Sequence, residues 1–263
     1  MSEAPLTRIG RRFAELRRAG RSAFVGFVVA GDPSLERTVD LAQRLEDGGV
    51  DVLELGVPFS DPLADGPVIQ RASQRALERG VTLPRILETV RRIRERSDLP
   101  LLLFGYLNPL LRMGLERFGA EAGSAGVDGV LVTDLPPEEA GEWLKVARAR
   151  ALDTVFLAAP TSPDDRLSSL AEVSRGFVYA VSRTGTTGER SDVSADAALL
   201  LGRLRAVTAE PLALGFGIST PAQVAQAAAL ADGVVVGSAL VRVLEENREG
   251  DITEHVRWLR SAM

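Results

Sequence analysis

The chain has 263 residues, of which 45% are hydrophobic and 25% are charged, and its formal net charge is -5. No apolar run approaches the roughly 20 residues that span a bilayer, and no apolar segment follows the first charges, so we expect no membrane segment, no signal peptide and a cytoplasmic location. The negative charge argues against nucleic acid as a partner. The absence of cysteine excludes disulfides and thiolate chemistry.

Lysine and histidine are almost absent. Lys145 is the only lysine and His255 the only histidine, and both lie in segments that predict surface helices. Schiff-base catalysis, Ser-His catalysis and histidine-bound metals therefore lack suitable side chains, and we expect no metal site. Proton transfer must depend mainly on Asp, Glu, Tyr or Arg.

The predicted elements begin with an amphipathic helix around Arg8–Ala19. After it, short apolar runs alternate with longer amphipathic stretches, which is the pattern of repeated βα units in a parallel sheet. The eight runs are Ala23–Ala30, Val50–Val57, Leu99–Tyr106, Val127–Asp134, Asp153–Pro160, Gly176–Ser182, Pro211–Gly217 and Asp232–Ser238. Eight units favour a closed barrel over an open doubly wound sheet. We predict an α/β fold, a single (β/α)8 TIM-barrel domain over residues 1–263, with the first helix as an extra element over its N-terminal mouth.

The second run, Val50–Val57, contains the first candidate catalytic residue. Alternation along a strand places Glu54 on the face opposite Leu53 and Leu55. The apolar face should pack against helices, so Glu54 should point into the barrel near its C-terminal end, where enzymes of this fold have their active sites. Burial raises the pKa of a carboxyl group toward neutrality, which suits a general acid or base. The alternative is a structural ion pair with one of the many arginines.

The loop after this run is rich in Pro, Asp and Gly and is long for a simple connection. Asp61 and Asp65 are both candidates for catalysis, and both are equally candidates for an Asx turn or a helix cap before Pro67. Asp134, after the fourth run, is a similar rival whose expected role is capping or loop anchoring. Spacing alone does not separate Asp61 from Asp65.

Small residues follow the last three runs and predict a phosphate site. Backbone N–H groups and helix N-termini bind phosphate at this place in many barrels, and no lysine is required. The residues concerned are Gly185, Thr187, Gly188, Gly215, Gly217, Ser219, Gly237 and Ser238. The polar segment 182–197 has the composition of a lid that closes over a substrate.

The segment from Glu54 to Pro67, ELGVPFSDPLADGP, resembles the signature of the tryptophan synthase alpha subunit family. Similar segments occur through the whole chain, namely FVVAGDP, GYLNP, DLPPEE, APTSPDDR, SRTGTTG, GFGIS and VVVGSALV. The resemblance implies a lyase that cleaves indole-3-glycerol phosphate into indole and glyceraldehyde 3-phosphate by a retro-aldol route, as the alpha reaction of L-tryptophan biosynthesis. It also implies a barrel without a cofactor of its own.

The resemblance assigns a role to each carboxylate. Glu54 would protonate the indole carbon that bears the glycerol chain and help to deprotonate the side-chain hydroxyl. Asp65 would hold the indole N–H and stabilise developing positive charge. A retro-aldol reaction without lysine or metal needs an electron sink, which protonation of the indole ring creates.

The family pattern also implies substrate-binding residues. Tyr179 would lie near the reacting side chain, Phe27 and Leu131 would line the indole, and Thr187 would hydrogen-bond to Asp65. The phosphate would be bound by Gly188, Gly217, Gly237 and Ser238.

The implied partner is the beta subunit, which carries pyridoxal phosphate and accepts indole in an α2β2 complex. The surface facing it would include Pro58–Asp65 and Gly105–Pro109. Three alternatives remain, namely a free-standing indole-3-glycerol phosphate lyase, a phosphosugar isomerase or synthase, and a non-catalytic barrel that binds phosphorylated ligands and regulates a partner. The phosphosugar enzymes do not predict the Glu54–Pro67 segment. Retention of both carboxylates argues against the regulatory barrel.

Overall fold

The strands of this protein form one closed ring. The computed structural model describes residues 6–181, 195–215, 217–246 and 251–263. Its strands are β1 (Ala23–Val29), β2 (Val52–Gly56), β3 (Leu101–Gly105), β4 (Gly129–Val132), β5 (Asp153–Val155), β6 (Leu157–Ala158), β7 (Val178–Val181), β8 (Leu212–Gly215) and β9 (Gly233–Val236). Their order is β5-β4-β3-β2-β1-β9-β8-β7-β6, and all the hydrogen-bonded pairs are parallel.

The predicted eight-run barrel is confirmed, with one refinement. The fifth run, Asp153–Pro160, forms two short strands, β5 and β6, on either side of Phe156. β5 pairs with β4 and β6 pairs with β7, so together they occupy one position in the ring. At this position the ring of strands is therefore closed by the covalent chain at Phe156, which links β5 to β6.

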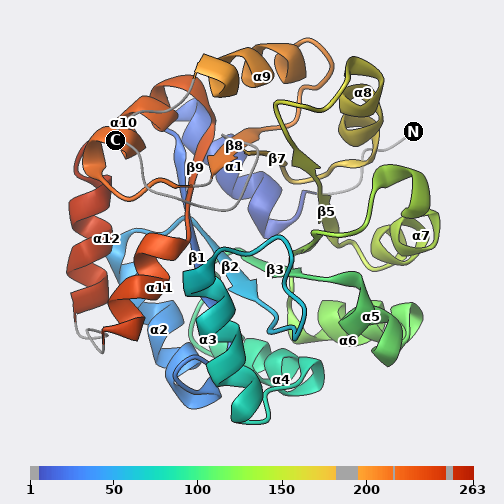
Figure 1. The fold of residues 1–263 in the computed structure, drawn as a ribbon, viewed down its shortest axis with the longest axis vertical. Coiled ribbons are helices and arrows are strands. Elements are labelled where there is room, and N and C mark those ends of the chain that lie inside the picture. The colour runs from blue at the N-terminus through green and yellow to red at the C-terminus, as the bar shows by residue number, and fades with distance from the viewer. Residues whose placement is uncertain (1–5, 182–194, 216, 247–250) are drawn as a thin grey trace.

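Helices surround the strands, as Figure 1 shows along the barrel axis. They are α1 (Arg8–Arg18), α2 (Leu35–Gly48), α3 (Pro67–Glu78), α4 (Leu83–Arg94), α5 (Leu107–Met113), α6 (Leu115–Ala125), η1 (Pro137–Glu139), α7 (Gly141–Ala149), α8 (Asp164–Val173), α9 (Ala195–Arg205), α10 (Pro221–Leu230), α11 (Ser238–Glu245) and α12 (Ile252–Arg260). No helix among the described residues combines the length and apolar character that crossing a membrane requires.

Local sequence explains where α2 begins and ends. Ser34 accepts a hydrogen bond from the backbone N–H of Arg37 and so caps the first turn. Gly49 follows the last turn with φ 103°, a conformation that glycine adopts without strain. The helix therefore ends just before β2 and sets where that strand starts.

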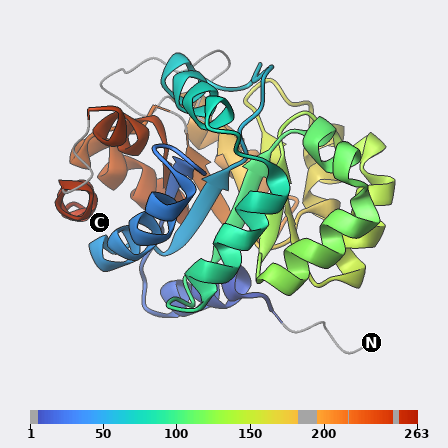
Figure 2. The ribbon, with the colours of Figure 1, turned by 90° about the horizontal axis from the view of Figure 1, so that it is seen from below.

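Helix α1 lies across the N-terminal end of the barrel, as predicted, and Figure 2 shows it at the opposite end from α3. Thr7 caps it by accepting the N–H of Gly10. Its apolar side buries Ile9, Phe13 and Leu16. The helix thus closes the end of the ring away from the carboxyl ends of the strands.

Aspartates at this N-terminal end are satisfied by arginines and backbone amides. Three aspartates each lie immediately before a strand. Each accepts, at 2.8 Å, the backbone N–H of a residue at the start of the neighbouring strand, and each also forms an ion pair with an arginine. The pairs are Asp51 with Arg12, Asp128 with Arg94 and Asp232 with Arg205. These buried or half-buried carboxylates join neighbouring strands to one another and to surrounding helices.

Asp153, the first residue of β5, is the exception at this end. Its carboxylate accepts a hydrogen bond from the hydroxyl of Thr7. Burial raises the pKa of Asp153 to about 7, and the bond from Thr7 opposes that rise. The N-terminal end of the barrel therefore contains one buried carboxyl group with a raised pKa.

Candidate active site

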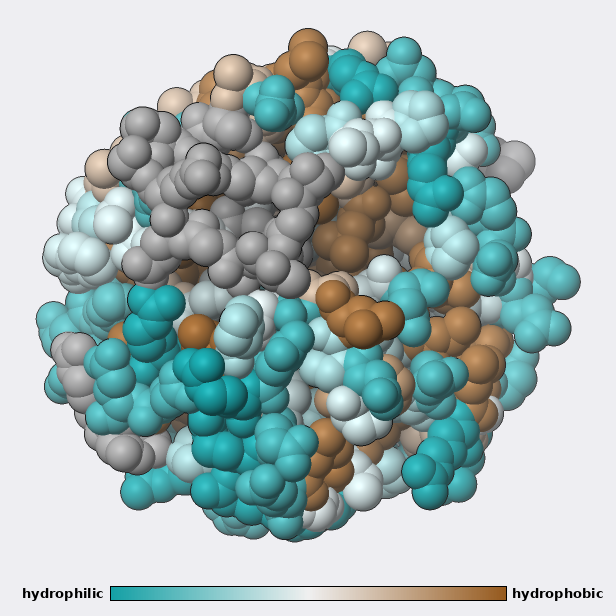
Figure 3. Space-filling view, viewed as in Figure 1, coloured by the Kyte–Doolittle hydropathy of each residue, from teal (hydrophilic) through white to brown (hydrophobic). Residues whose placement is uncertain are grey.

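A cavity of about 330 Å³ opens at the carboxyl ends of the strands. Figure 3 shows this face, with apolar side chains visible in the hollow near its centre and polar ones around much of the rim. The described residues that line the cavity come from β1, β2, β3, β7 and β9, from the segments 64–69 and 217–219, and from residue 237 and the first turns of α11. The cavity therefore brings together residues that lie far apart in sequence.

Glu54 lies in β2 and points into this cavity, as strand alternation predicts. Its side chain is almost fully buried, at 1% exposed, and its Oε1 atom has no hydrogen-bond partner among the described residues. Burial raises the pKa of Glu54 to about 8. No arginine in the described part of the chain forms an ion pair with it, so the structural alternative for Glu54 is not supported. The carboxyl group is protonated at neutral pH.

Asp65 lies in the same cavity, at the end of the loop that follows β2. It is buried, and its Oδ2 accepts a hydrogen bond from the hydroxyl of Tyr106 at 3.1 Å. Burial raises the pKa of Asp65 to about 6, although the Tyr106 hydrogen bond lowers it. Most Asp65 carboxyls are therefore ionised at neutral pH, in contrast to Glu54.

The structure separates the three aspartates that the sequence left as rivals. Asp61 is exposed and accepts a hydrogen bond from its neighbour Ser60 at 2.5 Å. Asp134 accepts the backbone N–H of Leu107 at 2.7 Å, at the first residue of α5, which confirms the predicted anchoring role. Of the three, only Asp65 lines the cavity.

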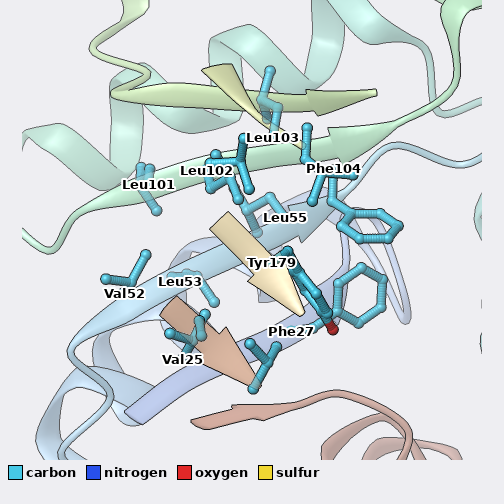
Figure 4. Close-up of a cluster of buried hydrophobic side chains, with 14 of the residues drawn as sticks. Val25, Phe27, Val52, Leu53, Leu55, Leu101, Leu102, Leu103, Phe104 and Tyr179 are labelled. Atoms are coloured by element: carbon cyan, nitrogen blue, oxygen red, sulfur yellow. The ribbon is translucent and has the colours of Figure 1, made fainter. Parts of the chain in front are cut away.

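Aromatic rings form one wall of the cavity. Phe27 and Phe104 meet edge to face with their centroids 5.3 Å apart, and Figure 4 shows both rings beside Tyr179 at one end of the buried cluster. Two strand glycines leave room for these rings, because a Cβ on Gly56 would overlap Phe27 and a Cβ on Gly215 would overlap Tyr179. Gly215 thus makes space for an aromatic ring.

Leu131, predicted to line the indole, is fully buried in β4 and stands opposite Phe104 in register. The residues lining the cavity include Phe104 and omit Leu131. Sequence reasoning missed Phe104. It pairs with Gly56, two residues beyond Glu54, and so shares the inward face, but this register becomes visible only in the structure.

Small residues at the far side of the cavity include three of the predicted phosphate ligands. Gly217, with φ 79°, Gly237 and Ser238 all line the cavity, and Ser238 is the first residue of α11. Arg242, one helical turn later, is the one positively charged side chain among the described lining residues. The other predicted ligand, Gly188, and the substrate-binding Thr187 fall within 182–194 and lie outside the described residues.

Tyr106 is the second residue that sequence reasoning missed. Besides donating to Asp65, its hydroxyl accepts the N–H of Ala64 at 3.0 Å, and its ring lies 5.0 Å from that of Phe59. These contacts fasten the loop after β2 to the end of β3. No local pattern indicates them, since the two hydrogen-bonded residues are 41 positions apart.

The site's chemistry rests on carboxylates and aromatic rings. Within 6–181, 195–215, 217–246 and 251–263, no group of three or more potential ligands could hold a metal ion. A parallel barrel whose mouth holds one protonated and one ionised carboxyl beside an aromatic wall is typical of an enzyme that moves protons on a small substrate.

The family model described as tryptophan synthase alpha chain matches residues 13–262, and the chain belongs to this family. It is 54% identical to the tryptophan synthase alpha chain of Solibacter usitatus over 249 residues, which cover 95% of this chain and 93% of that protein. It is 51% identical to the alpha chain of Geobacter sulfurreducens, with 98% of each covered.

Two solved structures are also similar. Mycobacterium tuberculosis tryptophan synthase superposes with a TM-score of 0.92 at 39% identity, with 98% of both chains covered. A structure of the tryptophan synthase α2β2 complex of Pyrococcus furiosus, concerned with mutual activation, superposes with a TM-score of 0.85 at 37% identity, covering 92% of this chain and 99% of that one.

Proposed function

We propose that this protein cleaves indole-3-glycerol phosphate into indole and glyceraldehyde 3-phosphate, the alpha reaction of tryptophan biosynthesis. The observation that carries the proposal is the pair of carboxyl groups, Glu54 and Asp65, buried in one cavity with their pKa values near 8 and 6. Such a pair offers a proton donor and an anion at the same pH. Family membership supplies the substrate.

Glu54 performs the proton transfers. Its protonated carboxyl donates to the indole carbon that bears the glycerol chain, which leaves an iminium-like ring that can accept electrons. The resulting carboxylate takes the proton from the adjacent side-chain hydroxyl, the carbon–carbon bond breaks, and its electron pair returns to the ring. Glu54 is then protonated again, so the protons balance without another acid.

Asp65 stabilises the charged intermediate. The ionised carboxylate accepts the indole N–H and lies near the positive charge that protonation creates. The hydroxyl of Tyr106 holds Oδ2 of Asp65 and favours its charged form. The asymmetry between the two carboxyl groups therefore matches the two roles.

The remaining residues position the substrate. Phe27 and Phe104 line the indole, and Tyr179 lies near the glycerol chain. The phosphate lies at the other side of the cavity, where Gly188, Gly217, Gly237 and Ser238 bind it. Thr187 hydrogen-bonds to Asp65. The guanidinium of Arg242 adds positive charge at that side of the cavity.

We propose an α2β2 complex with the beta chain, as in the Pyrococcus furiosus enzyme, with pyridoxal phosphate on the beta chain. Leu63 supports the location of the interface, because this apolar side chain is 89% exposed at the tip of the loop after β2. A groove of about 590 Å³ adjoins that loop and includes Pro58, Phe59, Asn108 and Pro109. An exposed apolar residue beside such a groove is typical of a docking surface.

The test is indole release from indole-3-glycerol phosphate by the purified chain, with and without the beta chain of the same organism. We expect turnover that the beta chain stimulates. Asp65→Asn should lower kcat by about 100-fold. Asp61→Asn is the matched control in the same loop. Because Asp61 lies outside the cavity but in the loop that faces the beta chain, the variant is compared with wild type without the beta chain, where its kcat should stay within about twofold.

Other results would favour the alternatives. Full activity that the beta chain leaves unchanged indicates a free-standing lyase. Binding of the substrate without any turnover indicates a regulatory barrel and contradicts the proposed function.

A further inference from the structure

Helices α3 and α11 both line the cavity, lie side by side and pack against each other. The first turn of α3 follows Asp65 directly and lines the cavity through residues 67–69. Helix α11 lines it through Ser238, Ala239 and Arg242. The helix that follows the indole-binding carboxylate thus contacts the helix that starts at the phosphate side.

Beyond their first turns, the two helices are joined by ion pairs. Arg71 of α3 donates from Nε and Nη2 to the two oxygens of Glu245, at 2.7 and 2.8 Å. Arg75, one turn further along α3, donates from Nη1 to Oε1 of the same carboxylate at 3.0 Å. The hydrogen bonds from Arg71 are the main reason that the pKa of Glu245 falls to about 2. Glu245, the last residue of α11, is therefore charged under all working conditions.

A buried carboxylate fixes the second arginine. Asp32, which follows β1 and is 3% exposed, accepts from Nε and Nη2 of Arg75 at 2.9 and 2.6 Å. Paired bonds of this kind hold a guanidinium in one orientation. Glu245 is thus held by two arginines of α3, and one of them, Arg75, is also anchored to Asp32 after β1.

We propose that Glu245, Arg71 and Arg75 are positioning residues that couple phosphate binding at α11 to the placement of Asp65 at the start of α3. This inference rests on the proposed function. When the phosphate binds at the start of α11, the helix is held in one position, and Glu245 transmits that position to α3 through Arg71 and Arg75. Asp65, which lies two residues before α3, is then aligned with the indole N–H.

The location of these ion pairs favours a positioning role over a stabilising one. The Arg71 side chain is 54% exposed and that of Glu245 is 23% exposed. Pairs this accessible to water contribute little to folding. Small displacements of catalytic groups, in contrast, lower rates strongly.

The experiment compares Glu245→Gln with wild type on two substrates, indole-3-glycerol phosphate and indole-3-glycerol, in the presence of the beta chain. We expect kcat/KM for the phosphorylated substrate to fall about 10-fold, mainly through kcat, and that for indole-3-glycerol to change less than about twofold. The matched control is Glu254→Gln, which breaks an exposed pair with Arg257 on α12 and should change neither value more than about twofold.

Arg71→Gln is the second variant, for the case that Glu245→Gln does not fold. It leaves the Asp32–Arg75 pair intact and should show the same dependence on phosphate. Equal losses on both substrates, or a loss below twofold on the phosphorylated one, overturn the coupling while leaving the proposed function in place. Absence of wild-type turnover of indole-3-glycerol phosphate overturns the proposed function and the coupling with it.

Discussion

The two ends of the barrel use buried carboxylates in opposite ways. At the N-terminal end, Asp51 and Asp128 each meet arginine and a backbone N–H. At the mouth, Glu54 has an oxygen without a partner among the described residues, and Asp65 is held by a tyrosine hydroxyl. The first arrangement joins neighbouring strands, whereas the second leaves a carboxyl group able to exchange protons.

A raised pKa alone does not distinguish a catalytic residue. Asp153 at the N-terminal end has a pKa of about 7, which lies between those of Asp65 and Glu54. It differs from them because it lies in β5, away from the cavity. A carboxyl group of this barrel is therefore a catalytic candidate only where burial raises its pKa and it also lines the cavity.

The strongest test of this contrast is Glu54→Gln. Glutamine keeps the shape but donates no proton, so kcat should fall by about 1000-fold or more. The unfolding free energy of the variant should instead be higher than that of the wild type at alkaline pH. The pKa of Glu54 is raised from 4.5 to about 8, so the unfolding free energy of the wild type falls as pH rises between these values.

Glu54→Gln removes this pH dependence, and at pH 8 it should be more stable than the wild type by a few kcal/mol, because a tenfold difference in proton affinity corresponds to about 1.4 kcal/mol. Indole release and urea denaturation at pH 5 and pH 8 measure the two effects. A kcat within tenfold of wild type would contradict the role of Glu54.

The second test removes a carboxylate from the N-terminal end. Asp128→Ala removes the carboxylate from the buried Arg94 and leaves the N–H of Leu101 without its acceptor, so the unfolding free energy should fall by about 3 kcal/mol. The folded fraction should keep its kcat within about twofold. Asp98→Ala is the control, because Asp98 pairs with Arg8, which also binds Asp128, but its side chain is 92% exposed. A comparable loss of stability in that control would refute the explanation.

Tyr106→Phe tests the support of Asp65. It removes the hydrogen bond that favours the charged carboxylate, so the pKa of Asp65 should rise above about 6 and kcat at pH 6 should fall several-fold, because more of Asp65 is then protonated. The fall in activity on the acidic side of the pH profile should move to higher pH. The pH dependence of kcat/KM from pH 5 to 9 measures this change, and an unchanged acidic limb would show that Tyr106 has no influence on Asp65.

The smallest effect on activity is expected for Asp153→Asn. Because burial raises the pKa of Asp153 from 3.8 to about 7, ionisation destabilises the fold progressively as pH rises through that window. Asparagine removes the charge, so the unfolding free energy at pH 8 should rise by up to a few kcal/mol, a gain that should shrink toward pH 4. Activity should remain within about twofold of wild type. A large loss of kcat would mean that distance from the cavity does not separate the two kinds of carboxyl group.

The barrel could be predicted from sequence because each βα unit carries its own periodic signal. Alternation in a single strand was also sufficient to place Glu54 inward. The division of the fifth strand at Phe156 could not be predicted, because it depends on pairing with β4 on one side and β7 on the other.

The candidate site was less predictable where contacts join distant segments. Asp61 and Asp65 have the same local chemistry, and only burial beside Tyr106 separates them. Gly215 was grouped with the phosphate ligands, whereas its missing side chain accommodates the ring of Tyr179. Such distinctions follow from three-dimensional proximity, which a single sequence does not contain.

Helix α1 has a consequence for how the chain acquires its fold during synthesis. Its arginines pair with carboxylates that appear one after another along the chain, Arg12 with Asp51, Arg8 with Asp128 and Arg17 with Asp232. Helix α1 is synthesised before all three of these partners, and the last of them is made only when β9 is about to emerge. The helix therefore acquires its last ion pair long after it has been made, and the ring of strands can be completed only once β9 has been synthesised.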